Sequence, residues 1–230
     1  MSLHAIVFAG PSLGGSVMAL PDGVELRGPA RRGDMLRAAI ERPAAIGLID
    51  GLFETTPSVW HKEIIQVMAE GIAVYGAASL GALRAAELAP FGMVGIGAIA
   101  QAYRTGQIER DDAVMVSHAP AELGHRAMTL ALVDAEHAIA QAEMAAGDRA
   151  LLLRLARRMN FRDRSWALIG DAFRQATGRD LPPIDQGLSL KRKDAELLLW
   201  TIAGPVAVPH VAPPPQSFFL RSLRAEISAA

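Results

Sequence analysis

The chain has 230 residues, 51% of them hydrophobic and 20% charged, which is enough apolar material for one large domain or a domain with a small companion. Its formal net charge of -1, with both signs mixed along the chain, offers no field to a phosphate backbone and argues against nucleic-acid binding. It contains no cysteine, which excludes disulfides, thiolate metal sites and a persulfide carried by this chain.

The beginning of the sequence lacks the basic start and long apolar run of a signal peptide, and no later apolar stretch is long enough to span a bilayer. We therefore expect a cytoplasmic protein that has no membrane partner.

The first half of the chain alternates short apolar runs with helical patterns. Strands are predicted at 5–9, 24–27, 45–50, 72–77 and 113–118, and helices at 35–41, 57–70 and 80–89. Thr56 and Pro57 suit the N-cap and the first position of the second helix. Such alternation is typical of a mostly parallel sheet with helices on both faces, so we predict a Rossmann-like α/β core over residues 1–120.

After Pro120 the strand signals stop. Helical patterns cover 121–146, 150–159, 165–176 and 190–203, which predicts an all-helical region over residues 121–203. Residues 204–216 contain five prolines and no charged side chain, so residues 204–230 are predicted to be an extended strap and a C-terminal tail. The strap either packs on the surface or binds a partner.

Ligands of open parallel sheets bind beyond the carboxyl ends of the strands. The first predicted strand leads into a glycine-rich loop at 10–15, the third ends at Asp50, and the fourth ends just before Ser79. The helix that follows the third strand carries His61 and Lys62 near its start. We therefore predict a functional site where these features converge.

Ser79 has the sharpest signal. Residues 77–81 read small-x-Ser-x-Gly between a strand and a helix, which resembles a nucleophile elbow with Ala77 in the place of the usual glycine. Helix amides beside the hydroxyl could hold an oxyanion. Serine is also a preferred N-cap, and the motif by itself favours capping over catalysis.

His61 is a candidate base that Asp50 could orient, with Lys62 as an alternative base or oxyanion partner. The ordinary alternative is that His61 and Lys62 lie on a solvated helix face and that Asp50 closes a turn. A buried strand that ends in a charged residue does, however, require a partner for that charge.

Gly10 and Ser12 could bind an anion through the first loop, although a plain tight turn fits as well. The loop lacks the second glycine of the dinucleotide fingerprint, and no phosphate-binding GxxxxGK[ST] motif occurs, so no nucleotide cofactor is predicted. Arg84 either reaches an anion or pairs with Glu87. The six histidines lack the close spacing of a zinc site, and Asp111 and Asp112 read as a cap or turn, so no metal is predicted.

Several segments in their order along the chain resemble TfuA-like proteins. The most specific are the His61-Lys62-Glu63 block and the Ser79 block, and the late segment 191–195 is a weaker match. The chain departs from the family pattern in two places. Leu80 stands in place of methionine, and the stretch 129–134 is less polar. The other matching segments are 8–13, 29–34, 49–54, 91–93 and 111–114.

This resemblance implies an accessory role in thioamide formation on ribosomal peptides or proteins, beside a YcaO-like enzyme that activates the backbone amide. Because the chain has no cysteine, we expect sulfur to arrive on another molecule. One hypothesis is that Ser79 attacks a thiocarboxylated sulfur-carrier protein and releases sulfide. The alternatives are a non-catalytic module that docks on the YcaO-like enzyme, and an α/β enzyme for a small molecule unrelated to sulfur.

Overall fold

A single five-stranded sheet lies at the centre of the molecule in the computed structural model, which describes residues 4–14, 19–52, 56–205, 207 and 210–228. Gly15, the last residue of the predicted loop, lies outside the described residues, as do residues 206, 208, 209, 229 and 230 of the predicted strap and tail. The strands are β1 (Ala5–Phe8), β2 (Val24–Arg27), β3 (Ala45–Leu48), β4 (Ala73–Ala77) and β5 (Val94–Ile96).

All four strand pairs are parallel, and the order across the sheet is β2-β1-β3-β4-β5. Strands β1, β3 and β4 are buried at every position, as expected of a parallel sheet with helices on both faces. The predicted α/β class is therefore confirmed. The chain order reverses between β1 and β3, and this switch point is where open α/β sheets bind ligands.

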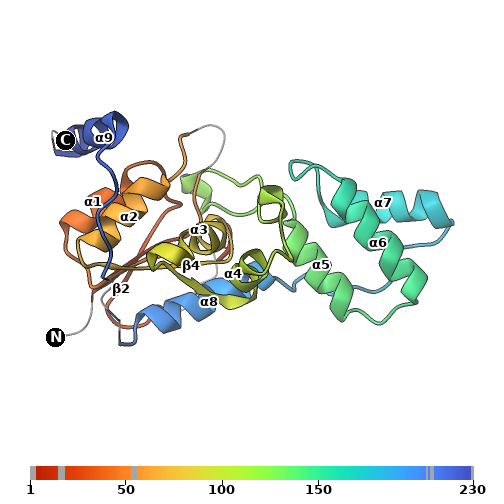
Figure 1. Ribbon diagram of the computed structural model, residues 1–230. Helices are drawn as coiled ribbons and strands as arrows, with labels where there is room; N and C mark the ends of the chain where they lie inside the picture. The colour runs from red at the N-terminus through yellow and green to blue at the C-terminus, as the bar shows by residue number, and fades with distance from the viewer. Residues whose placement is uncertain (1–3, 15–18, 53–55, 206, 208–209, 229–230) are drawn as a thin grey trace.

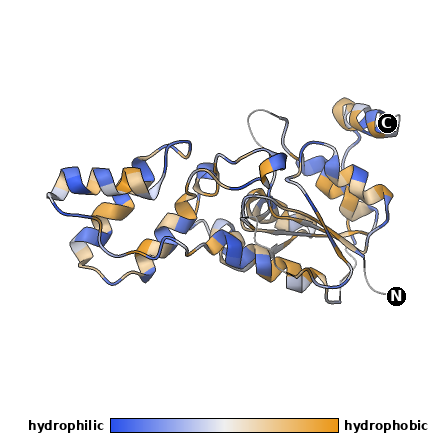
Figure 2. Ribbon diagram, turned by 180° about the vertical axis from the view of Figure 1, so that it is seen from behind, coloured by the Kyte–Doolittle hydropathy of each residue, from blue (hydrophilic) through white to orange (hydrophobic). Residues whose placement is uncertain are grey.

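Helices cover both faces of the sheet (Figure 1). Helices α1 (Asp34–Ile40), α2 (His61–Ala69) and α3 (Leu80–Leu88) pack on one face, and α9 (Phe218–Ser228) packs outside them against α1. Helix α8 (Leu190–Ile202) packs on the other and buries Leu198, Leu199 and Ile202 against β1, β3 and β4. Figure 2 shows the hydrophobic strands between these layers.

The fifth strand is not where the sequence predicted it. β5 is only three residues long, whereas 113–118 forms no strand beyond an isolated bridge between His118 and Ala127. Ala113 and Val114 are buried instead among the helices, which explains their apolar character without a sheet. Helix α4 (Gly97–Arg104), which was not predicted, connects β5 to this segment.

Two helix boundaries also differ from the predictions. α2 begins at His61 rather than at Pro57. Trp60 is still extended, and the Glu63 carboxylate accepts a hydrogen bond from the Trp60 amide at 2.7 Å, which caps the helix at this residue. The predicted helix at 121–146 is interrupted: after a 3-10 turn at Ala121–Leu123, Gly124 adopts φ 68°, and α-helix resumes only at residue 132.

Three helices, α5 (Leu132–Gln141), α6 (Ala146–Arg158) and α7 (Trp166–Thr177), extend away from the sheet as a helical lobe (Figure 1). The chain then returns so that α8 covers the sheet. The predicted helical region 121–203 thus contributes both the projecting lobe and one covering helix. No helix in the described ranges is long and apolar enough to cross a membrane.

The described part of the proline-rich strap crosses α2. Val211 packs against the core of this face, and the side-chain amide of Gln216 donates to that of Gln66 at 3.3 Å. The strap ends at α9, whose Leu220 and Leu223 are buried in the same core.

Candidate functional site

Asp50 holds the loop that follows β1. Its carboxylate, 2% exposed, lies just after β3 and accepts hydrogen bonds from the amides of Gly10 and Ser12 at 2.8 and 2.9 Å and from the Ser12 hydroxyl at 2.7 Å. Ser12 is also buried. The structure thus brings three predicted residues together at the switch point, because a buried carboxylate requires several donors.

These hydrogen bonds change what the first loop can do. The two amides and the hydroxyl predicted to bind an external anion already surround the carboxylate of Asp50. An anion bound at Gly10 and Ser12 would lie against that charge and would have to displace it. Charge recognition at this edge must therefore come from other side chains.

A sharp turn carries Ser79 from β4 to α3. The Ser79 amide donates to the Ala77 carbonyl at 2.7 Å, and the residue between them, Ala78, has φ 62°. This is a γ-turn with the rare left-handed sign, which is strained for a residue with a Cβ atom. Backbone strain of this kind at a strand-to-helix turn matches a nucleophile elbow, except that it falls one residue before the serine.

Gly81 allows this turn to sit close to the sheet. A Cβ atom at Gly81 would lie 1.6 Å from the Leu48 carbonyl oxygen of β3, and one at Gly76 would lie 2.0 Å from the Gly81 carbonyl oxygen. The glycine of the small-x-Ser-x-Gly pattern is therefore required by the approach of α3 to β3. That approach fixes the height of Ser79 above the sheet.

The Ser79 hydroxyl does not cap α3. No cap hydrogen bond is made by this side chain, and its Oγ instead donates to the Val114 carbonyl at 3.5 Å. Ser79 is 7% exposed and lines a pocket of about 260 Å³ together with Asp50, Val116, His118 and Phe161. The hydroxyl has therefore a weak partner and access to a cavity.

Lys191, which was not among the predicted site residues, donates from Nζ to the same Val114 carbonyl at 2.7 Å. The side chain is 2% exposed, and the carboxylate of Asp134 accepts the Lys191 amide at 2.9 Å. Burial raises the pKa of Asp134, an effect that Lys191 opposes. A buried cation and a serine hydroxyl thus meet at one carbonyl oxygen.

His118 contributes a basic nitrogen to the Ser79 pocket. Its Nδ1 lies 2.8 Å from the Ala119 carbonyl oxygen, which can only accept, so Nδ1 carries the proton and the neutral ring has its lone pair on Nε2. The ring meets His125 edge-on with centroids 5.6 Å apart. Burial lowers the pKa of His125, and the neighbouring His118 lowers it further.

The remaining predicted residues lie elsewhere. His61 Nε2 is 2.7 Å from the Glu87 carboxylate. Glu87 lies eight residues after Ser79 on α3, which places it about 12 Å from Ser79 along the helix axis. Lys62 is exposed and, with His61, lines a separate pocket beneath the strap. Arg84 donates to the Val59 carbonyl and pairs with Glu87 at 2.6 Å. The structure does not bring these three side chains to Ser79.

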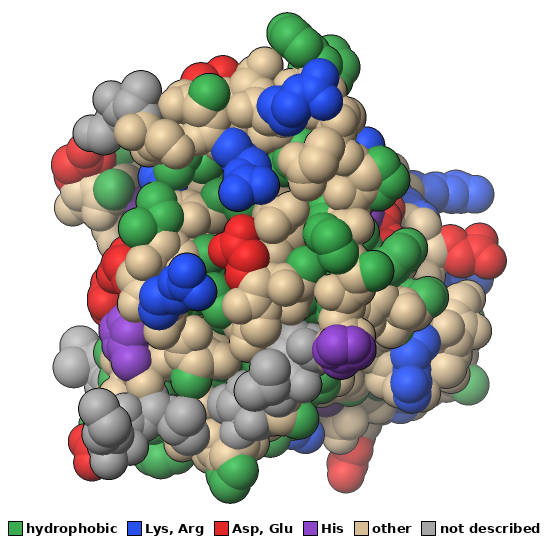
Figure 3. Space-filling model, turned by 60° about the vertical axis from the view of Figure 1, so that its left-hand side comes forward, with side chains coloured by type: hydrophobic (Ala, Val, Ile, Leu, Met, Phe, Trp, Pro, Cys, Tyr) green, Lys and Arg blue, Asp and Glu red, His purple; other side chains and the backbone are tan. Residues whose placement is uncertain are grey.

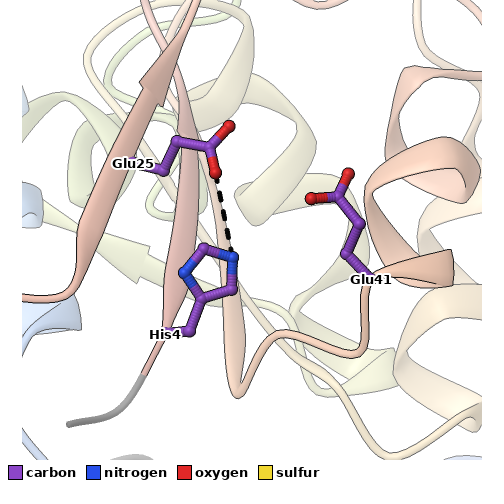
Figure 4. A group of neighbouring side chains, drawn as sticks. All are labelled: His4, Glu25 and Glu41. Atoms are coloured by element: carbon purple, nitrogen blue, oxygen red, sulfur yellow. Dashed lines mark ion pairs between the residues drawn. The ribbon is translucent and has the colours of Figure 1, made fainter.

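The described residues include one close group of metal-ligand types, His4, Glu25 and Glu41, which is exposed and remote from Ser79 (Figure 4). Arg27 pairs with both carboxylates, at 2.6 Å to Glu25 and 2.7 Å to Glu41, and this pairing lowers the pKa of Glu41. The Arg27 guanidinium therefore explains why these two carboxylates lie close together.

Comparison with known proteins gives one family. Residues 50–165, half of the chain, match the family model described as TfuA-like protein. A search of curated proteins found no match. The matched range includes Asp50, Ser79 and His118 but ends before Lys191.

Proposed function

This chain belongs to the TfuA-like family, which is linked to an accessory role in thioamidation, and we propose that its part in that role is to release sulfide from a thiocarboxylated sulfur carrier beside a YcaO-like enzyme. The observation that carries this proposal is the shared contact of Ser79 and Lys191. Both side chains donate to the Val114 carbonyl, and both are buried next to pockets at the switch point of the sheet.

The charge of the substrate suits this arrangement. A thiocarboxylate is an anion at neutral pH, and an anion repels a nucleophile unless a cation is near. The Lys191 ammonium is buried, so its field is screened less than that of a surface lysine. We assign Lys191 the role of attracting the thiocarboxylate and stabilising negative charge on its oxygen and sulfur, with the Leu80 amide at the start of α3 as a second donor.

The first chemical step is acyl transfer to Ser79. Attack of Oγ on the thiocarboxylate carbon forms a C–O bond and breaks the C–S bond. The hydroxyl proton leaves with the sulfur, so the products are an acyl-serine ester and hydrosulfide, which carries the single negative charge of the substrate. Because the sulfur of a thiocarboxylate is already anionic, the C–S bond breaks only as this sulfur receives the hydroxyl proton, so that hydrosulfide departs and not the sulfide dianion.

Water completes the cycle by attacking the ester. This step releases the carrier carboxylate, restores the Ser79 hydroxyl and produces one proton. Nε2 of His118, the basic nitrogen of a ring in the same pocket, is suited to accept that proton. Asp50 keeps the first loop in place and is a positioning residue in this scheme, because its oxygen atoms already bond to Gly10 and Ser12.

A second candidate function is docking on the YcaO-like enzyme without catalysis. It is favoured by an aromatic cluster on α9, where Phe218 and Phe219 are 68% and 67% exposed and Phe219 meets Trp60 edge-on. Figure 3 shows the end of the molecule on the left of Figure 1, where hydrophobic side chains reach the surface among lysines and arginines.

The test of catalysis is sulfide release from a purified thiocarboxylated carrier. Ser79→Ala should keep the fold and lose turnover by roughly 10³ or more, the usual effect of removing a nucleophile. Ser165→Ala is the matched control, because the Ser165 hydroxyl does cap a helix by accepting the Leu168 amide. It should cost about 1 kcal/mol of stability and leave turnover near normal.

The test of docking is thioamidation by the YcaO-like partner in excess free sulfide. A sulfide-releasing enzyme becomes dispensable under these conditions, whereas a docking module stays necessary. Full turnover of Ser79→Ala, together with continued dependence on the chain in excess sulfide, would overturn the hydrolase proposal in favour of docking.

A further inference from the structure

Two arginines near the site make no ion pair with any residue that the structure describes. Arg126 and Arg192 are exposed, and within the described ranges no carboxylate pairs with either guanidinium. This distinguishes them from Arg84, which pairs with Glu87, and from the loop amides, which are occupied by Asp50. Among the described residues, Arg126 and Arg192 therefore offer guanidinium groups that are open to an external anion at this end of the sheet.

Both arginines line one groove beside the Ser79 pocket. The groove has a volume of about 340 Å³, and its lining includes Ser12, Thr129 and Lys191 as well as the two arginines. Pro11 and Val116 line both the groove and the Ser79 pocket, so the two cavities are neighbours across these residues. A chain that lies in the groove can continue past them to Ser79.

Arg192 lies against the first loop. Gly14 has φ 61°, and a Cβ atom there would lie 2.8 Å from Nη2 of Arg192. The positive φ favours glycine at this position, and the Arg192 guanidinium lies next to it at the groove wall. The Arg192 amide is held in turn by the Ser189 hydroxyl at 3.0 Å, which caps α8 and fixes the helix end that carries the arginine.

The charge of the lining is positive. Three cations, Arg126, Lys191 and Arg192, face one carboxylate, Asp134. That carboxylate is occupied, because it accepts hydrogen bonds from the Lys191 amide and the Ser189 hydroxyl. An incoming anion therefore meets two exposed guanidinium groups that pair with no carboxylate of the described residues, and guanidinium groups recognise carboxylates with directed hydrogen bonds.

We propose that this groove binds an acidic, extended peptide segment and guides it toward Ser79. The identity of that segment as the tail of a thiocarboxylated carrier rests on the proposed function. The groove is of the size that accepts several side chains rather than a folded domain. A peptide is favoured over a nucleotide because the loop amides that would cradle a phosphate are occupied by Asp50.

The experiment measures binding of a fluorescently labelled ten-residue Glu/Gly peptide by fluorescence anisotropy, with a Gln/Gly peptide of the same length as the neutral probe. The wild-type chain should bind the acidic peptide about tenfold more tightly, which corresponds to two exposed charge pairs. Arg126→Gln/Arg192→Gln should remove the difference between the two peptides. Arg154→Gln is the matched control, since Arg154 is exposed on α6 and does not line the groove.

Equal affinity of the wild-type chain for both peptides, or retained preference in the double variant with a native circular dichroism spectrum, would overturn the groove. The result is separate from catalysis, because Ser79→Ala should bind the acidic peptide as the wild type does. Loss of preference in the double variant with full sulfide release by Ser79→Ala would uphold the groove and reject the nucleophile. Retained preference in the double variant, together with loss of sulfide release by Ser79→Ala, would reject the groove and leave the nucleophile standing.

Discussion

Replacing Gly81 with alanine tests the packing that holds Ser79 in place. The added Cβ atom would lie 1.6 Å from the Leu48 carbonyl oxygen, about half of the 3.0 Å below which real Cβ contacts essentially never fall. The obstacle is backbone on both sides, so no rotamer change relieves it, and α3 must move away from β3. We expect a loss of about 3 kcal/mol or more, above the usual 1–3 kcal/mol of overpacking. This is a large part of the 5–15 kcal/mol that stabilises a typical domain.

The control substitutions are also Gly→Ala within helices. Gly147 in α6 has nothing within 4 Å of the added atom, and Gly170 in α7 meets only Leu181 at 3.8 Å. Alanine at Gly147 should stabilise the fold by about 0.4–1 kcal/mol, because it restricts the unfolded chain. Urea unfolding followed by circular dichroism gives all three values. A Gly81→Ala variant within 0.5 kcal/mol of the wild type would refute the close approach of α3 to β3.

Three further outcomes are expected. Lys191→Met keeps the apolar stem of the side chain, so this variant should fold. Its rate of sulfide release should fall by roughly 10²–10³, the range for removing a donor that stabilises transition-state charge. A near-normal rate would remove Lys191 from the mechanism. His61→Ala should retain near-normal release in the same assay, because His61 is held at Glu87 rather than at Ser79, and a comparable loss would contradict that position. Burial raises the pKa of Glu63 to about 7 despite the two amides it accepts, so its stabilising contribution is present below about pH 4.5 and is lost as the pH rises through 7. Relative to Glu63→Gln, the unfolding free energy of the wild type should therefore fall by up to about 3 kcal/mol over this window, and parallel pH profiles would argue against the shift.

The sequence predicted the sheet because its strands are buried on both faces and appear as continuous apolar runs ended by glycine or a polar residue. The same logic led to Asp50 and Ser79, since each directly follows such a run. It did not predict β5, because Val94–Ile96 is too short and contains a glycine. It assigned 113–118 to the sheet because burial among helices produces the same apolar signal as burial in a sheet.

Lys191 was missed because it stands in a run of charges, Lys191-Arg192-Lys193, which is typical of a solvated helix face. A signal was nevertheless present. Ala195, Leu198, Leu199 and Ile202 follow Lys191 at helical spacing and form the buried stripe of α8. A lysine on the apolar stripe of a helix requires a polar partner inside the protein, and here that partner is the Val114 carbonyl.

The arrangement of α8 has a consequence for how the protein is made. The sheet face that α8 covers is complete once β4 and β5 have left the ribosome, yet its cover follows roughly one hundred residues later. At about 5–20 residues per second, this apolar face stays bare for on the order of ten seconds during synthesis. Lys191 reaches Val114 only when α8 docks, so a nascent or truncated chain with a folded sheet has Ser79 without its cation. On the proposed function, sulfide release would begin only after α8 has been made and has docked, which would limit hydrolysis by incomplete chains.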